Sequence, residues 1–451
     1  MAHIAHNPDA WPDMRTALDL GAVLPRTAEL RDGHLWIGGV DTVALAAQFG
    51  TALYVMDEAH IRGQLREYLT QLREHYPTAD VAYAGKAFCC QAMCRLVAEE
   101  GGWLDVSSGG ELACAQAAGF PVERVVVHGN CKTPLELWAA IEAGAGLIVA
   151  DCFEELERID RVAGELGVIQ PILLRLTPGI IADTHEYMQT GAEDSKFGFG
   201  IGAGAALAAV EKALQAPGIA LKGYHIHIGS QIFAFESYQR AIEVLLDFAA
   251  GVRDATGFTP EVLDLGGGVG VAYQADDQPG SIAAFASTVT AALCQQLAAH
   301  DLPEPRLLVE PGRSIVANAG VTLYTVGVLK DLPGIRTWVA VDGGMSDNIR
   351  TALYDAHYEC LLANKADQPR STVVTVAGKH CESGDVVAID ASLQPAEPFD
   401  ILAVCTTGAY NYSMASNYNR QVRPGVVWVQ DGQAREVLRR ETYEDLLRCE
   451  V

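Results

Sequence analysis

The sequence predicts an α/β plus all-β protein, in which a parallel (β/α)₈ TIM barrel is joined to a C-terminal β-barrel or sandwich domain. From about residue 80, short β-branched runs alternate with longer helical patterns, and the alternation repeats eight times. Beyond Ala317, strand-like runs follow one another without long helices. Residues 34–38 are also strand-like, so we expect the N-terminal segment to complete the β domain. The expected boundaries are 1–55 for the N-terminal segment, 56–316 for the barrel and 317–451 for the β domain.

Each expected barrel strand is short and is followed by a stretch with apolar residues at helical spacing. Eight such units over about 235 residues match a (β/α)₈ barrel in number and length. A doubly wound open sheet is the alternative that the strand count does not exclude. The expected barrel strands are 81–86, 103–107, 124–128, 147–151, 172–177, 221–228, 262–265 and 307–310, and the helices between them include 154–166, 205–215, 237–252 and 282–300. The expected strands of the β domain are 321–329, 338–341, 372–377, 386–389 and 426–430.

The composition favours a folded protein that acts on small molecules. Hydrophobic residues make up 49% of the 451 residues and charged residues 20%, which is typical of soluble globular proteins. The net charge of -25 disfavours nonspecific attraction to nucleic acid or anionic lipid. The N-terminus has neither a basic head nor an apolar stretch of signal-peptide length, and we expect no apolar run of about 18 residues anywhere in the chain. We therefore expect a cytoplasmic protein with no nucleic-acid or membrane partner.

The chain has 11 cysteines without regular spacing, and with no export signal we expect reduced thiols. Cys89, Cys90 and Cys94 form the one tight cluster in the sequence. Their spacing is not the paired two-residue gap of a zinc site, and Cys90 and Cys94 share a helix face. We interpret the cluster as small buried apolar residues and expect no metal site.

Polar residues that are costly in apolar strands fall repeatedly at the C-terminal ends of the expected barrel strands, where barrel enzymes carry their chemistry. For any one of them, a structural ion pair is the alternative explanation. Their gathering on one rim favours a functional site. They are Lys86, Asp105, Arg175, His225, His227, the glycines Gly266, Gly267 and Gly268, and the segment Glu310-Pro-Gly-Arg.

The triple glycine at residues 266–268 allows backbone N–H groups to approach an anion, and the loops after strands seven and eight of this fold commonly bind phosphate. We therefore expect a phosphorylated ligand. The glycine spacing of dinucleotide-binding proteins and the Walker lysine pattern are both absent from the sequence. By itself a triple glycine is equally typical of a simple turn, so it gains weight only from the other groups on the rim.

Together these groups fit pyridoxal 5′-phosphate. The Lys86 amine can form an imine with the aldehyde, the glycine amides can bind the phosphate, and Glu310 can pair with the protonated pyridine nitrogen. His227 is the better candidate to stack on the ring, because Gly229 and Ser230 follow it closely. A satisfied structural role is the alternative for each histidine alone.

Longer motifs resemble, over almost the whole chain, the barrel-type decarboxylases of the alanine racemase and ornithine decarboxylase superfamily. Taken together they are far more specific than any single motif. In the barrel they are Tyr83-Ala-Gly-Lys-Ala, Asp105-Val-Ser-Ser-Gly-Gly-Glu-Leu, Thr184-His-Glu-Tyr-Met-Gln-Thr-Gly, His225-Ile-His-Ile-Gly-Ser-Gln, Asp264-Leu-Gly-Gly-Gly and Glu310-Pro-Gly-Arg. Beyond it they are Asp342-Gly-Gly-Met, Asp347-Asn-Ile-Arg-Thr-Ala-Leu-Tyr, Cys381-Glu-Ser-Gly-Asp and Gly408-Ala-Tyr-Asn-Tyr-Ser.

The resemblance implies a role for each residue of the site. Lys86 would hold the cofactor as a Schiff base, and Cys381 would donate the proton. The other cofactor-binding residues would be Asp105, His227, Ser230, Gly266, Gly267, Gly268, Glu310, Gly312, Arg313 and Tyr410. The substrate-binding residues would be Arg313, Arg350, Tyr354, Glu382 and Tyr410.

The resemblance implies decarboxylation of meso-2,6-diaminopimelate to L-lysine, the last step of lysine biosynthesis. It also implies a head-to-tail homodimer in which the Cys381–Glu382 loop enters the neighbour's site. A sister decarboxylase of another D-amino acid, or of a carrier-bound or siderophore intermediate, is the main alternative. Arg350 favours diaminopimelate as the substrate, because its distal carboxylate needs a cationic partner. A non-catalytic regulator that binds the cofactor is a remote alternative, because Lys86 and Cys381 are both present.

Three positions depart from the family pattern. Thr351 stands where proline is usual, Gly85 where serine or valine often precedes the lysine, and Ser107 where valine is common. None removes a chemical group, but Thr351 predicts a looser segment around Arg350. The sequence leaves open whether residues 187–199 close as a lid.

Overall fold

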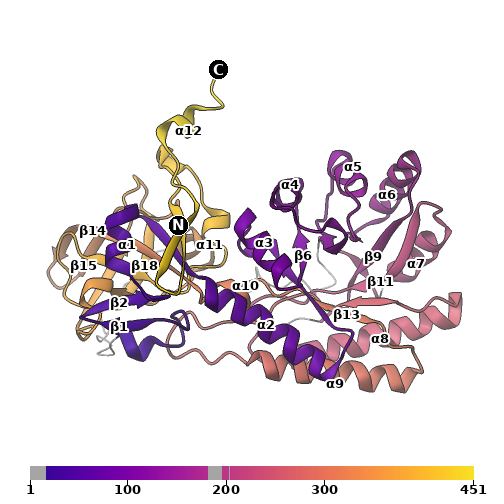
Figure 1. Ribbon diagram of the computed structural model, residues 1–451. Helices are drawn as coiled ribbons and strands as arrows, with labels where there is room; N and C mark the ends of the chain where they lie inside the picture. The colour runs from indigo at the N-terminus through magenta and orange to yellow at the C-terminus, as the bar shows by residue number, and fades with distance from the viewer. Residues whose placement is uncertain (1–16, 181–195, 203) are drawn as a thin grey trace. The chain divides into compact units, whose positions relative to one another are not determined.

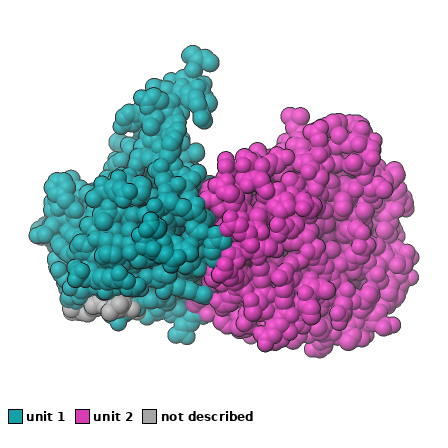
Figure 2. All heavy atoms as spheres, in the orientation of Figure 1, with its two compact units in different colours: residues 1–62, 271–278, 315–451 teal, residues 63–270, 279–314 magenta. Residues whose placement is uncertain are grey.

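The computed structural model describes residues 17–180, 196–202 and 204–451. The chain divides into two compact units, which Figure 2 distinguishes by colour. The first, which we call the barrel unit, comprises Gly63–Gly270 and Pro279–Ser314. The second, which we call the β unit, comprises the described residues of Met1–Arg62 with Val271–Gln278 and Ile315–Val451.

Eight parallel strands of the described barrel unit form a closed ring (Figure 1). They are β5 (Asp80–Ala84), β6 (Trp103–Val106), β7 (Val125–Val127), β8 (Leu147–Ala150), β9 (Gln170–Thr177), β11 (Ile219–His225), β12 (Val262–Asp264) and β13 (Arg306–Val309). The pairing of β13 with β5 and of β8 with β9 closes the ring, which confirms the predicted barrel and excludes the open sheet. The two-residue strand β10 (Phe199–Gly200) pairs with β9.

Helices connect successive barrel strands (Figure 1). They are α3 (Gln91–Glu99), α4 (Gly109–Ala118), α5 (Pro134–Glu142), α6 (Phe153–Leu166), α7 (Ala205–Gln215), α8 (Glu236–Thr256) and α9 (Ile282–His300), with 3₁₀ turns η2 (Gly85–Ala87) and η3 (Val122–Arg124). α2 (Glu58–His75) precedes β5, and the short α10 (Arg313–Val316) follows β13. By length and composition α9 could span a membrane, so the expectation that the chain has no apolar run of this length was wrong. It packs against α8, and its apolar side chains Phe285, Val289 and Leu293 are buried.

The barrel is filled by apolar side chains from facing strands. Val126, Leu173 and Leu308 are fully buried in one cluster with neighbouring strand residues. Such branched side chains suit strands that are covered on both faces. The polar residues of the sequence motifs therefore lie at the ends of the strands, beyond this filled layer.

The β unit contains a sheet in which the N-terminal part of the chain supplies an internal strand. β4 (Leu53–Asp57) lies between β14 (Gly320–Leu332) and β20 (Gly425–Gln430), antiparallel to the first and parallel to the second. The other strands are β1 (Glu29–Arg31), β2 (His34–Ile37), β3 (Val40–Asp41), β15 (Arg336–Val341), β16 (Cys360–Leu362), β17 (Thr372–Ala377), β18 (Val386–Leu393), β19 (Ile401–Val404) and β21 (Gln433–Leu438). The N-terminal segment thus completes the β domain, as predicted.

Short helices and buried apolar clusters complete the β unit. The helices are α1 (Thr42–Phe49), α11 (Arg350–Tyr354) and α12 (Tyr443–Leu447), with 3₁₀ turns η1 (Ala17–Leu20), η5 (Ala363–Lys365), η6 (Tyr412–Met414) and η7 (Tyr418–Arg420). Leu35 and Ile37 of β2 belong to the same buried cluster as Val321 of β14 and Val427 of β20. The strands of this unit that the sequence pattern did not predict are β1, β3, β4, β16, β19 and β21.

Leu173→Ala should lower the free energy of unfolding by about 2–5 kcal/mol, because it leaves a cavity in the filled barrel. Urea unfolding followed by circular dichroism measures this change. Leu135→Ala is the matched control, since Leu135 is 83% exposed and its loss should change stability by less than about 0.5 kcal/mol. Equal stability of the two variants would contradict the packing described for the barrel.

Candidate functional site

The C-terminal ends of the barrel strands bring the predicted polar groups together in the barrel unit. Asp105 pairs in register with Ala84, and His225 pairs with Asp264. Glu310 directly follows the last residue of β13. The carboxyl groups and imidazoles that lie far apart in sequence thus share one end of the barrel.

Two predicted positions differ slightly from the structure. β5 ends at Ala84, so Lys86 lies in the η2 turn and not in the strand. The Tyr83 hydroxyl donates to the Phe88 carbonyl at 2.8 Å and holds this turn. β11 ends at His225, so His227 belongs to the loop that follows. The exposed Lys86 side chain is thereby carried past the rim, close enough to Glu111 and His227 for its charge to affect their pKa values.

Glu310 is the centre of a buried polar network. Its Oε1 lies 2.5 Å from Nε2 of His128, and its Oε2 lies 3.2 Å from Nε2 of His225. Burial raises the pKa of Glu310, but the two imidazoles outweigh burial and hold it well below its usual range. Burial lowers the pKa of His225 to about 3, so its ring is neutral at pH 7. The carboxylate of Glu310 is therefore the charged member of this pair.

Two further carboxyl groups surround the network. Burial raises the pKa of Asp105, and burial together with Glu310 raises the pKa of Asp264 well above its usual range. Asp264 Oδ1 accepts the N–H of Gly266 at 2.9 Å. Among the described residues, Asp105 Oδ1, Asp264 Oδ2 and His225 Nδ1 are buried without a hydrogen-bond partner. Buried polar atoms of this kind mark a place for a polar ligand.

The same groups meet the distance requirement for a metal ion. His128, His225, Asp264 and Glu310 each place one donor atom within 4.8 Å of the others. By donor type alone, this set suits either a divalent cation or a protonated ring nitrogen beside Glu310. The loop next to it distinguishes the two, because it is shaped for an anion.

The loop after β12 leaves no room for side chains. A Cβ on Gly267 would lie 2.1 Å from the Glu310 carbonyl oxygen, and one on Gly268 would lie 2.4 Å from the Gly229 carbonyl oxygen. Gly266 and Gly268 also have φ values of 68° and 120°, which side chains rarely tolerate. A glycine loop without side chains lets an anion approach the backbone closely, as in the phosphate sites that this fold commonly provides. The triple glycine thus fits the phosphate of pyridoxal 5′-phosphate.

The groups beside the glycine loop match the remaining predicted cofactor residues. Arg313 Nη2 donates to Ser230 Oγ at 3.2 Å. The Gly267 N–H donates to His227 Nδ1 at 3.3 Å, and burial, with the Lys86 charge nearby, holds the pKa of His227 well below its usual range. A neutral, oriented imidazole is suited to lie on an aromatic ring.

Gly312 and Arg175 also lie in the barrel unit. A Cβ on Gly312 would lie 2.9 Å from Ala84 Cβ and 3.0 Å from Ala87 Cβ, so this glycine lets the Glu310 loop pack on the Lys86 turn. Arg175 is buried at the end of β9, 3.9 Å from Asp151, and its guanidinium lies over the Phe197 ring at 4.2 Å. Most of the 187–199 segment lies outside the described residues.

Sequence reasoning assigned no role to His128, Asp264 or Glu111. His128 and Asp264 stand at strand ends, as the predicted residues do, so the same rule would have found them. Glu111 lies on α4, where the Ser108 hydroxyl caps the helix by accepting the Glu111 N–H. Its Oε2 accepts the Ser107 N–H at 2.6 Å, and burial raises its pKa to about 7.

In the β unit, the predicted residues Arg350, Tyr354 and Tyr410 lie together. The buried Arg350 guanidinium lies 5.0 Å from the Tyr354 ring centre and 5.6 Å from that of Tyr410. Thr351 Oγ1 donates to the Val387 carbonyl at 2.8 Å. This bond ties α11 to β18, so Thr351 anchors the segment that carries Arg350.

Cys381 and Glu382 lie on the loop between β17 and β18 and are exposed. The Cys381 N–H donates to Asn419 Oδ1 at 3.0 Å. His380, just before them, is fixed by Asp385, whose Oδ2 lies 2.9 Å from His380 Nδ1 and accepts the His380 N–H at 2.7 Å. Sequence reasoning missed His380 and Asp385, which hold the base of this loop.

Comparison with known proteins agrees with the site. The chain matches the family model described as pyridoxal-dependent decarboxylase, pyridoxal binding domain, over residues 61–317. It is 48% identical over 419 residues to the diaminopimelate decarboxylase of Halalkalibacterium halodurans, covering 93% of this chain and 95% of that protein. It is 43% identical over 463 residues to the diaminopimelate decarboxylase of Mycobacterium tuberculosis, covering 100% of this chain and 99% of that protein.

A solved structure is also similar over nearly the whole chain. The diaminopimelate decarboxylase of M. jannaschii, in complex with L-lysine, superposes with a TM-score of 0.88 at 34% identity. The match covers 94% of this chain and 98% of that one.

Glu111→Gln should make the cofactor-free protein less sensitive to alkaline pH. The folded protein holds the Glu111 proton up to about pH 7, whereas the unfolded chain releases it near 4.5. The stability from this group is therefore complete below pH 4.5 and lost as the pH rises through 7. From pH 5 to pH 8, the free energy of unfolding of the variant, measured in urea, should rise relative to that of the wild type by on the order of 2 kcal/mol. The exposed Glu165→Gln variant should gain nothing, and parallel pH profiles for all three proteins would refute the assignment.

Proposed function

The chain belongs to the pyridoxal-dependent decarboxylases, and we propose that it converts meso-2,6-diaminopimelate to L-lysine and CO₂ with pyridoxal 5′-phosphate. The proposal rests on near-full-length relatives that are named for this activity. It also rests on the buried Glu310 carboxylate at the barrel end, the single observation that carries it. An anionic partner of this kind keeps a pyridine nitrogen protonated.

When bound, the protonated ring of pyridoxal phosphate takes up the electron pair that remains as CO₂ leaves. Glu310 keeps the ring nitrogen charged, and His128 and His225 keep Glu310 ionised through their hydrogen bonds. An arginine in place of Glu310 would not keep that nitrogen protonated, because two positive charges would repel each other. The carboxylate therefore favours decarboxylation over racemisation.

The residues that would hold the cofactor all belong to the barrel unit. Lys86 would bind the aldehyde carbon through its amine, and Asp105 lies buried near its charge. His227 would lie on the ring face. The phosphate would be bound by Ser230, Gly266, Gly267, Gly268, Gly312 and Arg313.

Arg350 and Glu382 carry the choice of substrate. The distal end of diaminopimelate has a carboxylate and an ammonium, which need one cation and one anion. Arg350 is buried against Tyr354 and Tyr410, and burial strengthens its pairing with a carboxylate. Glu382 is exposed and offers its carboxylate to the ammonium, while the Arg313 guanidinium offers a second cation. A substrate with a distal amine alone would leave Arg350 without a partner.

Cys381 would donate the proton that replaces CO₂ on the substrate carbon. In a single chain this thiol is exposed to water, which is a poor setting for stereospecific protonation. We therefore propose a homodimer in which the Cys381–Glu382 loop of one subunit completes the site of the other. We expect this enzyme to work in the cytoplasm and to act on a small-molecule substrate.

Product analysis with the meso, LL and DD isomers tests the proposed activity. With pyridoxal phosphate the protein should release CO₂ and form L-lysine from the meso isomer, and the Lys86→Ala variant should form none. Arg350→Met should raise KM for the meso isomer by roughly 100-fold, the cost of a lost charged contact of about 3 kcal/mol. CO₂ from D-ornithine or D-lysine, with no lysine from the meso isomer, would overturn the proposal.

Mixing Lys86→Ala with Cys381→Ala should restore activity if two subunits build each site. Each variant alone should be inactive. Random reassociation makes half of the dimers mixed, and each mixed dimer has one intact site, so about a quarter of wild-type activity should return. Each variant carried through the same mixing procedure alone is the control. No recovery, with mixed dimers present by native mass spectrometry, would place both residues in one chain's site.

A further inference from the structure

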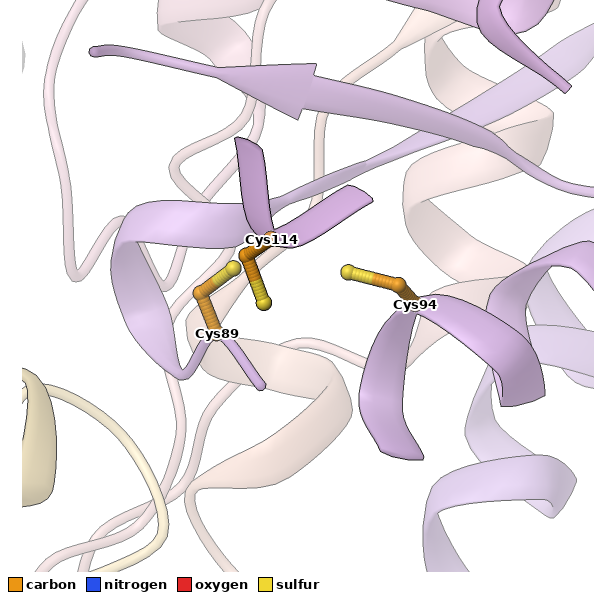
Figure 3. A group of neighbouring side chains, drawn as sticks. All are labelled: Cys89, Cys94 and Cys114. Carbon is orange, nitrogen blue, oxygen red and sulfur yellow. The ribbon is translucent and has the colours of Figure 1, made fainter. Parts of the chain in front are cut away.

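Three thiols converge in the barrel unit, apart from the Glu310 network. Cys89 precedes α3, Cys94 lies within α3 and Cys114 lies on α4. Their sulfur atoms all lie within 4.8 Å of one another. Figure 3 shows the Cys94 sulfur pointing toward the pair formed by Cys89 and Cys114. The sequence expectation of no metal site considered Cys90 and not Cys114, which comes from the next helix.

Two of these three thiols are less buried than residues that serve only to fill the core. Cys94 is buried, but Cys89 and Cys114 are only half-buried, so the predicted apolar role does not suit Cys89. Arg95, on α3, adds a nearby positive charge. Two of the three thiols therefore belong to partly exposed residues, which a cation can reach from solvent.

We propose that Cys89, Cys94 and Cys114 form a binding site for one thiophilic d¹⁰ cation of the Zn²⁺ or Cu⁺ class. Three thiolates at about 2.3 Å from one ion place their sulfur atoms roughly 3.7–4.0 Å apart. The observed cluster reaches this spacing with small side-chain movements. Each thiol gives up its proton to solvent as its bond to the ion forms. Water can supply the fourth ligand of Zn²⁺, because Cys89 and Cys114 are only half-buried. Cu⁺ bound by three thiolates needs no fourth ligand.

A metal ion accounts for the third sulfur, which a disulfide does not. A disulfide joins two sulfur atoms at about 2.05 Å and leaves the third unused. Soft thiolate ligands in a group of three select Cu⁺ and Zn²⁺ over the hard cations that carboxylates bind. Within the described residues, no carboxylate or imidazole belongs to this group.

The position of the site links it to the turn that carries Lys86. Cys89 lies three residues after Lys86, and the carbonyl of the intervening Phe88 is bonded to the Tyr83 hydroxyl. A bound ion would tie this turn to α3 and α4. We therefore expect the ion to raise the melting temperature of the protein independently of turnover.

Titration of the reduced holoenzyme with Cd²⁺ tests the site. The holoenzyme is used because its cofactor occupies the His128–Glu310 network, which contains no sulfur. The wild type should bind one Cd²⁺ per chain, with a thiolate-to-metal absorption band in the ultraviolet and a higher melting temperature. Protein loaded first with Zn²⁺ should need more Cd²⁺ to develop the band, and Cu⁺ should release bound Cd²⁺ from the protein, because the cations compete for the same thiolates.

Single variants identify the ligands. Cys89→Ser and Cys114→Ser should bind Cd²⁺ about tenfold more weakly or worse, and both positions are half-buried, so the variants should fold. Cys294→Ser, which removes an exposed thiol on α9, should bind as the wild type does. The proposal is overturned if the wild type shows no band, if the Cys89 and Cys114 variants bind equally well, or if peptide mapping finds two of the three thiols joined as a disulfide in the reduced preparation.

Discussion

The buried carboxylate of Glu310 and the two imidazoles that hold it are the interaction on which the rest of the site depends. The rings of His128 and His225 contact each other edge to face, with their centres 4.8 Å apart. Each imidazole is hydrogen-bonded to one carboxylate oxygen of Glu310. A lone carboxylate at this depth would shift its pKa upward and become neutral. The neighbouring carboxyls Asp105 and Asp264 do have raised pKa values, so the site concentrates its negative charge on Glu310.

Backbone packing connects this carboxylate to the other parts of the site. Gly267 packs on the Glu310 carbonyl, and Gly312 packs on Ala84 and Ala87 around the Lys86 turn. The lysine, the anion-binding loop and the carboxylate are therefore held by glycine contacts that tolerate no side chain. A site built in this way is preorganised, because none of its parts can move without disturbing the next.

Much of the fold and the cofactor site could be predicted, because both follow from short-range rules. Alternating strand and helix patterns predicted the barrel, and the rule that chemistry lies at strand ends located Lys86, His227 and Glu310 on one rim. What escaped were the partners in space. His128 reaches Glu310 across 182 residues, and Cys114 on α4 joins Cys89 and Cys94, which lie before and within α3. β4 was missed because its sheet partners lie more than 250 residues away in the chain.

The protonation state of the bound ring nitrogen tests the central claim most directly. Pyridoxal phosphate labelled with ¹⁵N in the ring can be bound to the wild type and to Glu310→Gln, and its nitrogen chemical shift recorded. The account predicts the shift of a protonated nitrogen in the wild type and a move toward the unprotonated value in the variant. An unprotonated nitrogen in the wild type would contradict the role given to Glu310 and its two histidines.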